Sequence, residues 1–180
     1  MKKTDIHHGR GFTLVEMIIV VMVIAILVGV VNGVSKMVSA RAASENTRMY
    51  MQTIMLAINA YHEATGNYPT QETSIPAVPD DWYPRMRPWE KRDRMWAAFC
   101  RNKKLYHQLT AVPSAQKKLT ALPKDAVSNI YGYGENVFVD GFETYMDYFE
   151  TGGIAGSPVL ISAGPDRTFD TEDDIRSDNR

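Results

Sequence analysis

The sequence predicts an α+β protein in which one long N-terminal helix packs on a small antiparallel sheet. Two observations predict this fold class. An apolar run and an amphipathic segment follow one another from residue 12 to a glycine at position 66. Short apolar runs bounded by glycine then recur in the second half of the 180-residue chain, as in strands joined by tight turns.

The first part of the predicted helix is long enough to cross a membrane. Every residue from 17 to 31 is apolar or glycine, and the run extends over residues 12–34. At about 1.5 Å per residue, a helix of this length spans a hydrocarbon core of roughly 30 Å. Basic residues precede the run and predict a cytoplasmic N-terminus, with the rest of a single-pass protein outside the cytoplasm. A cleaved signal peptide and a plain signal anchor remain as alternatives.

The second part of the helix has one apolar face. This face consists of residues spaced at i, i+3, i+4, i+7 and i+10, namely Met51, Ile54, Met55, Ile58 and Tyr61. The spacing predicts that it packs on a sheet, and Gly66 suits the left-handed cap that ends a helix. The whole helix, residues 12–65, is then about 80 Å long, which is longer than a globular core of this size needs.

Glu16 is an anomaly, because it places a carboxylate one turn inside the apolar run. It belongs to the sequence Gly11-Phe12-Thr13-Leu14-Val15-Glu16, which follows a short basic leader. This sequence resembles the start of the type IV pilin and type II secretion pseudopilin superfamily. Residues 61–70, with a Tyr, a Gly and then Tyr-Pro-Thr, are similar to the major pseudopilins.

The resemblance implies a set of processing and assembly steps. Residues 1–11 would be a leader that a prepilin peptidase removes by cutting between Gly11 and Phe12. The same enzyme would methylate the new N-terminal amine of Phe12. The carboxylate of Glu16 would pair with that amine in a neighbouring subunit, which gives a charge in lipid a physical reason to be there.

The middle of the chain, about residues 71–125, reads as an insertion into the compact family pattern. Its segment 82–104 mixes aromatic with basic residues, a combination that binds nucleic acid in some proteins. The alternative that we favour is an amphipathic helix, opened by Pro88, that buries its aromatic face. A second helical region is expected at 105–125, followed by strands at 137–139 and 158–162.

Five carboxylates lie within nine residues near the C-terminus, in a predicted loop over residues 160–176. They are Asp166, Asp170, Glu172, Asp173 and Asp174. Calcium prefers such oxygen ligands, although the spacing is not that of an EF-hand. The loop resembles the calcium loop of major pseudopilins. The resemblance implies Asp166, Asp173 and Asp174 as side-chain ligands, Asp170 as a weaker one, and the carbonyls of Leu160 and Ser162. Arg167 stands where that family usually has Gly. A solvated acidic tail is the alternative.

The sequence gives little support to an enzyme. It lacks the Gly-x-Ser-x-Gly pattern, and nothing in it places Cys100 near His62 or His107. That single cysteine also excludes an intrachain disulfide. The net charge of −1 gives no overall attraction to nucleic acid.

The resemblance therefore predicts a structural subunit of the bacterial inner membrane, with residues 66–180 as a periplasmic domain. The subunit would polymerise with itself into the pseudopilus of a type II secretion system, together with minor pseudopilins and an inner-membrane assembly platform. The polymer would drive folded proteins across the outer membrane. The alternative function is a surface pilin for adhesion, motility or DNA uptake.

Overall fold

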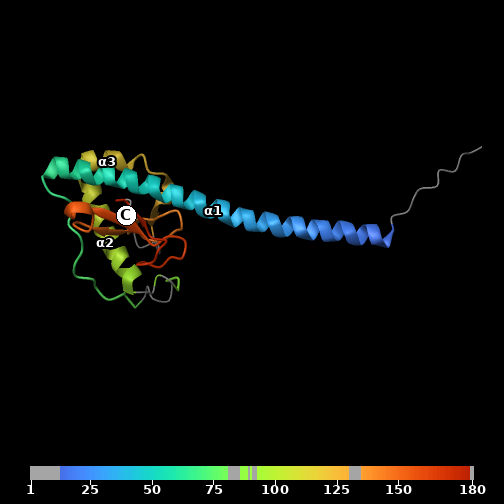
Figure 1. Ribbon diagram of the computed structural model, residues 1–180. Helices are drawn as coiled ribbons and strands as arrows, with labels where there is room; N and C mark the ends of the chain where they lie inside the picture. The colour runs from blue at the N-terminus through green and yellow to red at the C-terminus, as the bar shows by residue number, and fades with distance from the viewer. Residues whose placement is uncertain (1–12, 81–85, 89, 91–92, 130–134, 179–180) are drawn as a thin grey trace, which may run out of the picture. The chain divides into compact units, whose positions relative to one another are not determined.

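The fold was derived from a computed structural model that describes residues 13–80, 86–88, 90, 93–129 and 135–178, with side chains at all of these except 29–36. The chain divides into two compact units, Met1–Ser39 and Ala40–Arg180. The helix α1, Leu14–Thr65, contributes residues to both units (Figure 1). Each unit is described by itself below.

The helix α1 ends where the sequence predicts. Gly66 adopts φ +79°, a left-handed conformation that suits glycine, and its N–H donates to the carbonyl of His62 at 2.8 Å. Thr65 donates its hydroxyl to the carbonyl of Tyr61 at 2.9 Å, which satisfies another carbonyl of the last turn. The predicted start at residue 12 lies outside the described residues.

In its described residues, the unit Ala40–Arg180 has two small antiparallel sheets, where the sequence predicts one. The first pairs β1, Val127–Asn129, with β2, Asn136–Phe138. The second has the order β3–β4–β5, with β3 at Asp147–Phe149, β4 at Val159–Ser162 and β5 at Ile175–Arg176. In the described residues, an isolated antiparallel bridge between Val139 and Tyr145 lies between β2 and β3 and belongs to neither strand. The expected strands at 137–139 and 158–162 correspond to β2 and β4.

Two further helices, α2 and α3, lie within the insertion. The helix α2 runs from Asp93 to Ala111, and α3 runs from Pro113 to Leu119. The expected start of α2 at Pro88 and a break before residue 105 are therefore wrong. The helix continues through 105 because the buried positions of Asp93–Ala111 keep one helical period, and the break comes at Pro113, whose ring opens α3 at its first turn.

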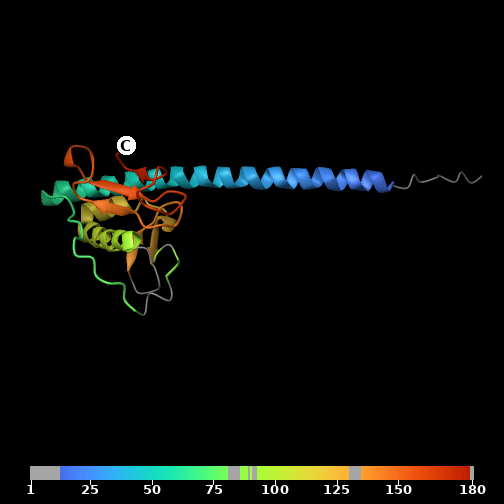
Figure 2. The same ribbon diagram turned by 60° about the horizontal axis from the view of Figure 1, so that its bottom comes forward.

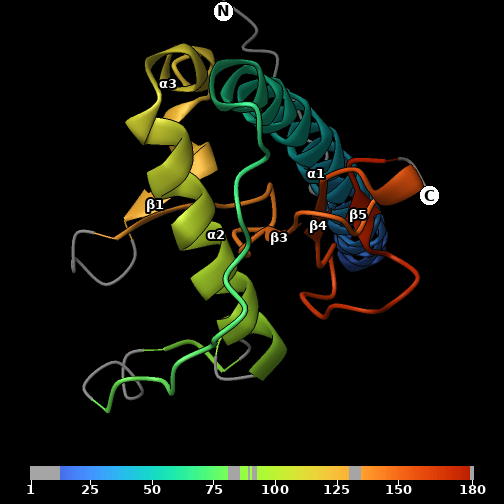
Figure 3. The same ribbon diagram turned by 90° about the vertical axis from the view of Figure 1, so that its left-hand side faces the viewer.

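The strands β3 and β4 lie between α1 and α2 (Figures 2 and 3). One core cluster joins the predicted face of α1 to α2, α3 and the strands, and in it Met51, Ile54 and Ile58 are fully buried. A second cluster joins the first half of α2 to β2, β3 and β4 and includes Phe169 of the acidic loop. The aromatic residues Phe138, Tyr145 and Tyr148 are buried in these clusters, whereas Tyr131 and Tyr133 lie outside the described residues.

The side chain of Asn102 connects β2 to the segment before β3. Its amide nitrogen donates to the carbonyls of Phe138 at 2.8 Å and Met146 at 2.6 Å, and its oxygen accepts the N–H of Phe138 at 2.7 Å. Asn102 is fully buried, so these bonds satisfy backbone groups that have no access to water. The amide thus takes the place of ladder hydrogen bonds between the two sheets.

Candidate functional site

The first turn of α1 forms a capping box around Glu16. The backbone N–H and the hydroxyl of Thr13 both lie 2.9 Å from Oε2 of Glu16, and the N–H of Glu16 donates to the Thr13 hydroxyl at 3.2 Å. This reciprocal pattern satisfies two amides that a helix start leaves without partners. Sequence reasoning missed the role of Thr13, although the spacing Thr-x-x-Glu is the usual signal for this cap.

The large apolar side chains that follow Glu16 on α1 are exposed. Their exposed fractions over residues 14–28 range from 46% at Val20 to 77% at Leu14. Among the described residues, no helix has the length and apolar character needed to cross a membrane. The predicted span includes residue 12 and the side chains at 29–34, all of which lie outside the described part.

The acidic loop after β4 closes on itself through its own carboxylates. Oδ2 of Asp173 accepts the N–H of Asp166 at 3.1 Å, and Oδ1 of Asp173 accepts the hydroxyl of Thr171 at 2.7 Å. Gly164 adopts φ +61°, and a Cβ at this position would overlap the carbonyl of Asp173. Arg167 adopts φ +58°, so the turn forms although arginine stands at a position that favours glycine.

Asp174 carries the atom of this loop that best suits a cation. Its Oδ2 accepts the N–H of Asp170 at 2.9 Å, whereas its Oδ1 is buried without a hydrogen-bond partner in the described part of the chain. Burial raises the pKa of the Asp174 carboxyl, and the neighbouring Asp170, Asp173 and Asp166 raise it further. A bound cation would remove both penalties. The described residues nevertheless contain no group of three His, Cys, Asp or Glu side chains arranged to hold a metal ion.

The two carbonyl ligands that the resemblance implies lie on β4. The carbonyl of Leu160 accepts the N–H of Ser177 at 3.0 Å. The hydroxyl of Ser162 donates to Oδ2 of Asp140 at 2.5 Å and accepts the N–H of Gly164 at 3.1 Å. Leu160 and Ser162 are fully buried, so their first role in this conformation is to hold the start of the acidic loop on the sheet.

The basic side chains described between residues 87 and 104 are paired within the fold. The ion pairs are Arg87 with Glu90 and Glu143, Arg94 with Asp147 and Asp170, Arg101 with Asp147, Lys103 with Glu135, and Lys104 with Glu72. Trp96 and Phe99 stack at 5.1 Å and are 8% and 3% exposed, so their faces are not open to bases. This arrangement favours the amphipathic packing helix over nucleic-acid binding. Trp82 and Trp89 lie outside the described residues.

The single cysteine and the two central histidines do not form a catalytic group. Burial raises the pKa of the Cys100 thiol to about 11, which leaves it protonated at neutral pH. His62 stacks on Tyr68 at a centroid distance of 4.3 Å, and Nε2 of His107 lies 3.3 Å from Oε2 of Glu135. The contacts of His62 and His107 are therefore with Tyr68 and Glu135 and not with the Cys100 thiol.

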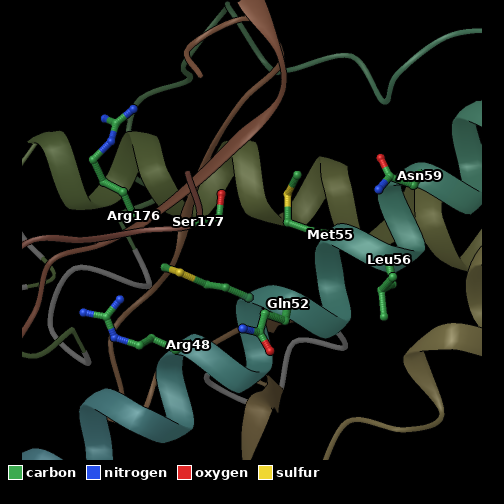
Figure 4. Close-up of a pocket in the computed structure, with 8 residues that line it drawn as sticks. Arg48, Gln52, Met55, Leu56, Asn59, Arg176 and Ser177 are labelled. Carbon is green, nitrogen blue, oxygen red and sulfur yellow. The ribbon is translucent and has the colours of Figure 1, made fainter. Parts of the chain in front are cut away.

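A groove of about 440 Å³ lies beside the second half of α1 (Figure 4). One wall is the helix, with Arg48, Gln52 and Asn59, and the other is formed by Arg176 and Ser177. The apolar lining comes from Met51, Met55 and Leu56. Leu56 is 57% exposed, so part of α1 beside β5 is open to solvent within the unit Ala40–Arg180.

Comparison with known proteins supports the class of the N-terminal segment. The family described as the prokaryotic N-terminal methylation motif matches residues 7–32. This match covers the end of the predicted leader, the predicted cleavage site and Glu16, and it is the motif of type IV pilin-like structural subunits. A leader of this type implies processing by a prepilin peptidase and assembly into polymers. No curated protein and no solved structure matches the chain.

Proposed function

We propose that this pilin-like chain is a subunit of the periplasmic pseudopilus of a type II secretion system, and that it polymerises through the first half of α1. The observation that carries the proposal is the methylation motif together with the exposed apolar residues 14–28. A helix that is apolar on all sides requires lipid or other helices around it. Within the inner membrane, lipid would cover the subunit before assembly, and neighbouring copies of α1 would cover it afterwards.

Glu16 gives this assembly its register. Cleavage between Gly11 and Phe12 creates a new amine four residues before the carboxylate. In a polymer, the methylated amine of one copy would meet Glu16 of the next, because a carboxylate among apolar residues is stable only beside a cation. The capping box holds Oε2 of Glu16 on Thr13, so that the carboxylate lies at the N-terminal end of the helix.

We further propose that the acidic loop binds calcium through Asp166, Asp173 and Asp174. Calcium would supply the positive charge that this loop requires and would cross-link its two ends, a function that disulfides perform in chains with more cysteines. The buried Oδ1 of Asp174 supports the proposal. With an ion at a hundredfold excess over its Kd, the folded state gains about 2.7 kcal/mol.

The calcium proposal is tested on the full chain in detergent. Adding calcium after chelation should raise the Tm of the wild type and leave the Tm of Asp174→Asn unchanged. The matched control is Glu172→Gln, which removes a carboxylate of the same loop that is not a proposed ligand. An equal Tm with and without calcium in the wild type would refute calcium binding.

The secretion role is tested in a host that has both a type II secretion system and surface pili. Deleting the gene should stop the export of folded proteins across the outer membrane and leave surface pili intact. A strain that loses pili and keeps export would instead identify a surface pilin. Mass spectrometry of the wild type should show a mature chain that starts at methylated Phe12, and a large side chain at Gly11 should block this cleavage.

A further inference from the structure

The basic segment 93–104 has no assigned role in assembly. Its charged side chains indicate that it holds the acidic loop. Two arginines of α2 share one buried carboxylate. Arg101 binds Asp147 with two hydrogen bonds, from Nε at 2.6 Å and Nη2 at 2.8 Å, and Nη1 of Arg94 contacts the same carboxylate. Asp147 is fully buried and can neutralise only one of the two guanidinium groups. One positive charge is therefore left over.

The acidic loop supplies the missing negative charge. Nε of Arg94 lies 3.4 Å from Oδ2 of Asp170, and the guanidinium lies over the ring of Phe169 at 4.9 Å from its centroid. Phe169 is 7% exposed and belongs to the core cluster of α2. Arg94 therefore contacts two consecutive loop residues, one through its charge and one through its face.

The contact also reaches Asp174. The N–H of Asp170 donates to Oδ2 of Asp174, whose other oxygen is the buried atom without a partner. Fixing Asp170 on α2 therefore fixes the orientation of the Asp174 carboxylate. Hydrogen-bonding groups that orient a metal-binding carboxylate typically change metal affinity 10-fold to 100-fold when they are lost.

We propose that Arg94 and Asp170 form a clasp that fastens the acidic loop to α2, and that Asp170 is a positioning residue and not a calcium ligand. The clasp stands on contacts within the fold, and only its effect on calcium affinity rests on the proposed function. The basic segment then has a role within the fold, because Arg94 of α2 provides a positive charge beside the carboxylates of the loop. The five carboxylates of the loop then have different tasks.

The test is a double-mutant cycle on the full chain in detergent with a chelator present. Asp170→Asn should lower the Tm by about 2–4 °C in the Arg94 background, as expected for a pair worth about 1 kcal/mol. It should have no further effect once Arg94 is replaced by Ala. Glu172→Gln is the matched control and should leave the Tm unchanged or raise it, because it only relieves repulsion. Arg94→Gln, which also removes the charge, repeats the cycle if the Ala variant does not fold.

Two results would overturn the clasp. In the first, the effects of the Arg94 and Asp170 substitutions add fully. In the second, Asp170→Asn raises the Tm under chelation and abolishes the calcium response while Asp174→Asn keeps it, as expected if Asp170 were a ligand. If calcium does not change the Tm of the wild type, the calcium proposal fails, and the cycle under chelation still decides whether the clasp exists.

Adding calcium tests the second half of the proposal. Arg94→Lys keeps the charge near Asp170 but loses the planar group that contacts Asp147, Phe169 and Asp170 together. The Kd of this variant for calcium should rise about tenfold, with Asp166, Asp173 and Asp174 unchanged. An unchanged Kd would show that the clasp does not position the ligands.

Discussion

The two halves of α1 contain similar apolar residues but have different surroundings. In the second half, the face with Met51, Ile54 and Ile58 is buried against strands and helices of the same chain. In the first half, all the large apolar side chains over residues 14–28 are at least 46% exposed. The second half is therefore stabilised by folding, whereas the first requires a cover from outside the chain, which assembly or lipid would provide.

The same substitution should lower stability strongly in the second half of α1 and not in the first, and this is the largest expected effect. Ile54→Ala removes a side chain that is 0% exposed and should lower the free energy of unfolding by about 3 kcal/mol. Ile24, which is 54% exposed, should tolerate the same change without loss of stability in the dispersed chain. Thermal unfolding in detergent measures both. A large loss at Ile24 would show that the chain itself covers the first half.

Cys100, which is buried on α2, reports on the packing of the folded unit Ala40–Arg180. Because burial raises its pKa to about 11, compared with about 8.5 for a free thiol, roughly one molecule in a thousand carries the thiolate at pH 8. Iodoacetamide should therefore label Cys100 only on unfolding, whereas a cysteine introduced at position 24 should react in dispersed chains. The raised pKa contributes stability below about pH 8.5, which is lost as the pH rises through 11. Rapid labelling of Cys100 in the native chain would contradict this packing.

The contact between α1 and the turn after β2 should be sensitive to one methyl group. The N–H of Gly141 donates to the hydroxyl of Thr47 at 2.9 Å, and a Cβ on Gly141 would overlap the backbone of Ala43. Gly141→Ala should therefore lower the free energy of unfolding by about 2 kcal/mol. Gly156→Ala is the control, since it has a positive φ but free space, and it should cost about 1 kcal/mol. If both variants lost the same free energy of unfolding, the close approach of Gly141 to α1 would not add to the cost of the substitution.

The smallest expected effect lies outside α1. Arg167→Gly places glycine at φ +58° and should raise the free energy of unfolding by about 1 kcal/mol without changing assembly. Chemical denaturation measures the first quantity, and cross-linking in membranes measures the second. Lower stability of this variant would show that the arginine side chain contributes more than its backbone conformation costs.

Local patterns predicted the parts of the fold that depend on nearby residues. The buried face of α1, its end at Gly66 and the strands at β2 and β4 follow from periodicity and turn residues. The strands β1, β3 and β5 have two or three residues that include polar ones, so no apolar run marks them in the sequence.

A short motif is the sequence signal for Gly11, Phe12 and Glu16, and the roles of these three residues stay predictions. The contacts of Asp147 with Arg94 and Arg101 join residues 53 and 46 positions apart, and no local pattern contains such pairs. Asn102 is similar, because a polar residue within an amphipathic helix is usually solvated. Its burial follows from the meeting of two sheets that the sequence did not separate.

The most direct test of self-assembly separates the charge of Glu16 from its role as a cap. Glu16→Gln keeps a side chain that can complete the capping box with Thr13 but removes the negative charge. In membranes with active prepilin peptidase, we expect cross-linked oligomers from the wild type and a severe loss of them in Glu16→Gln, with equal membrane insertion. If Glu16→Gln forms the same oligomers as the wild type, the pairing of this carboxylate with a neighbouring amine is contradicted.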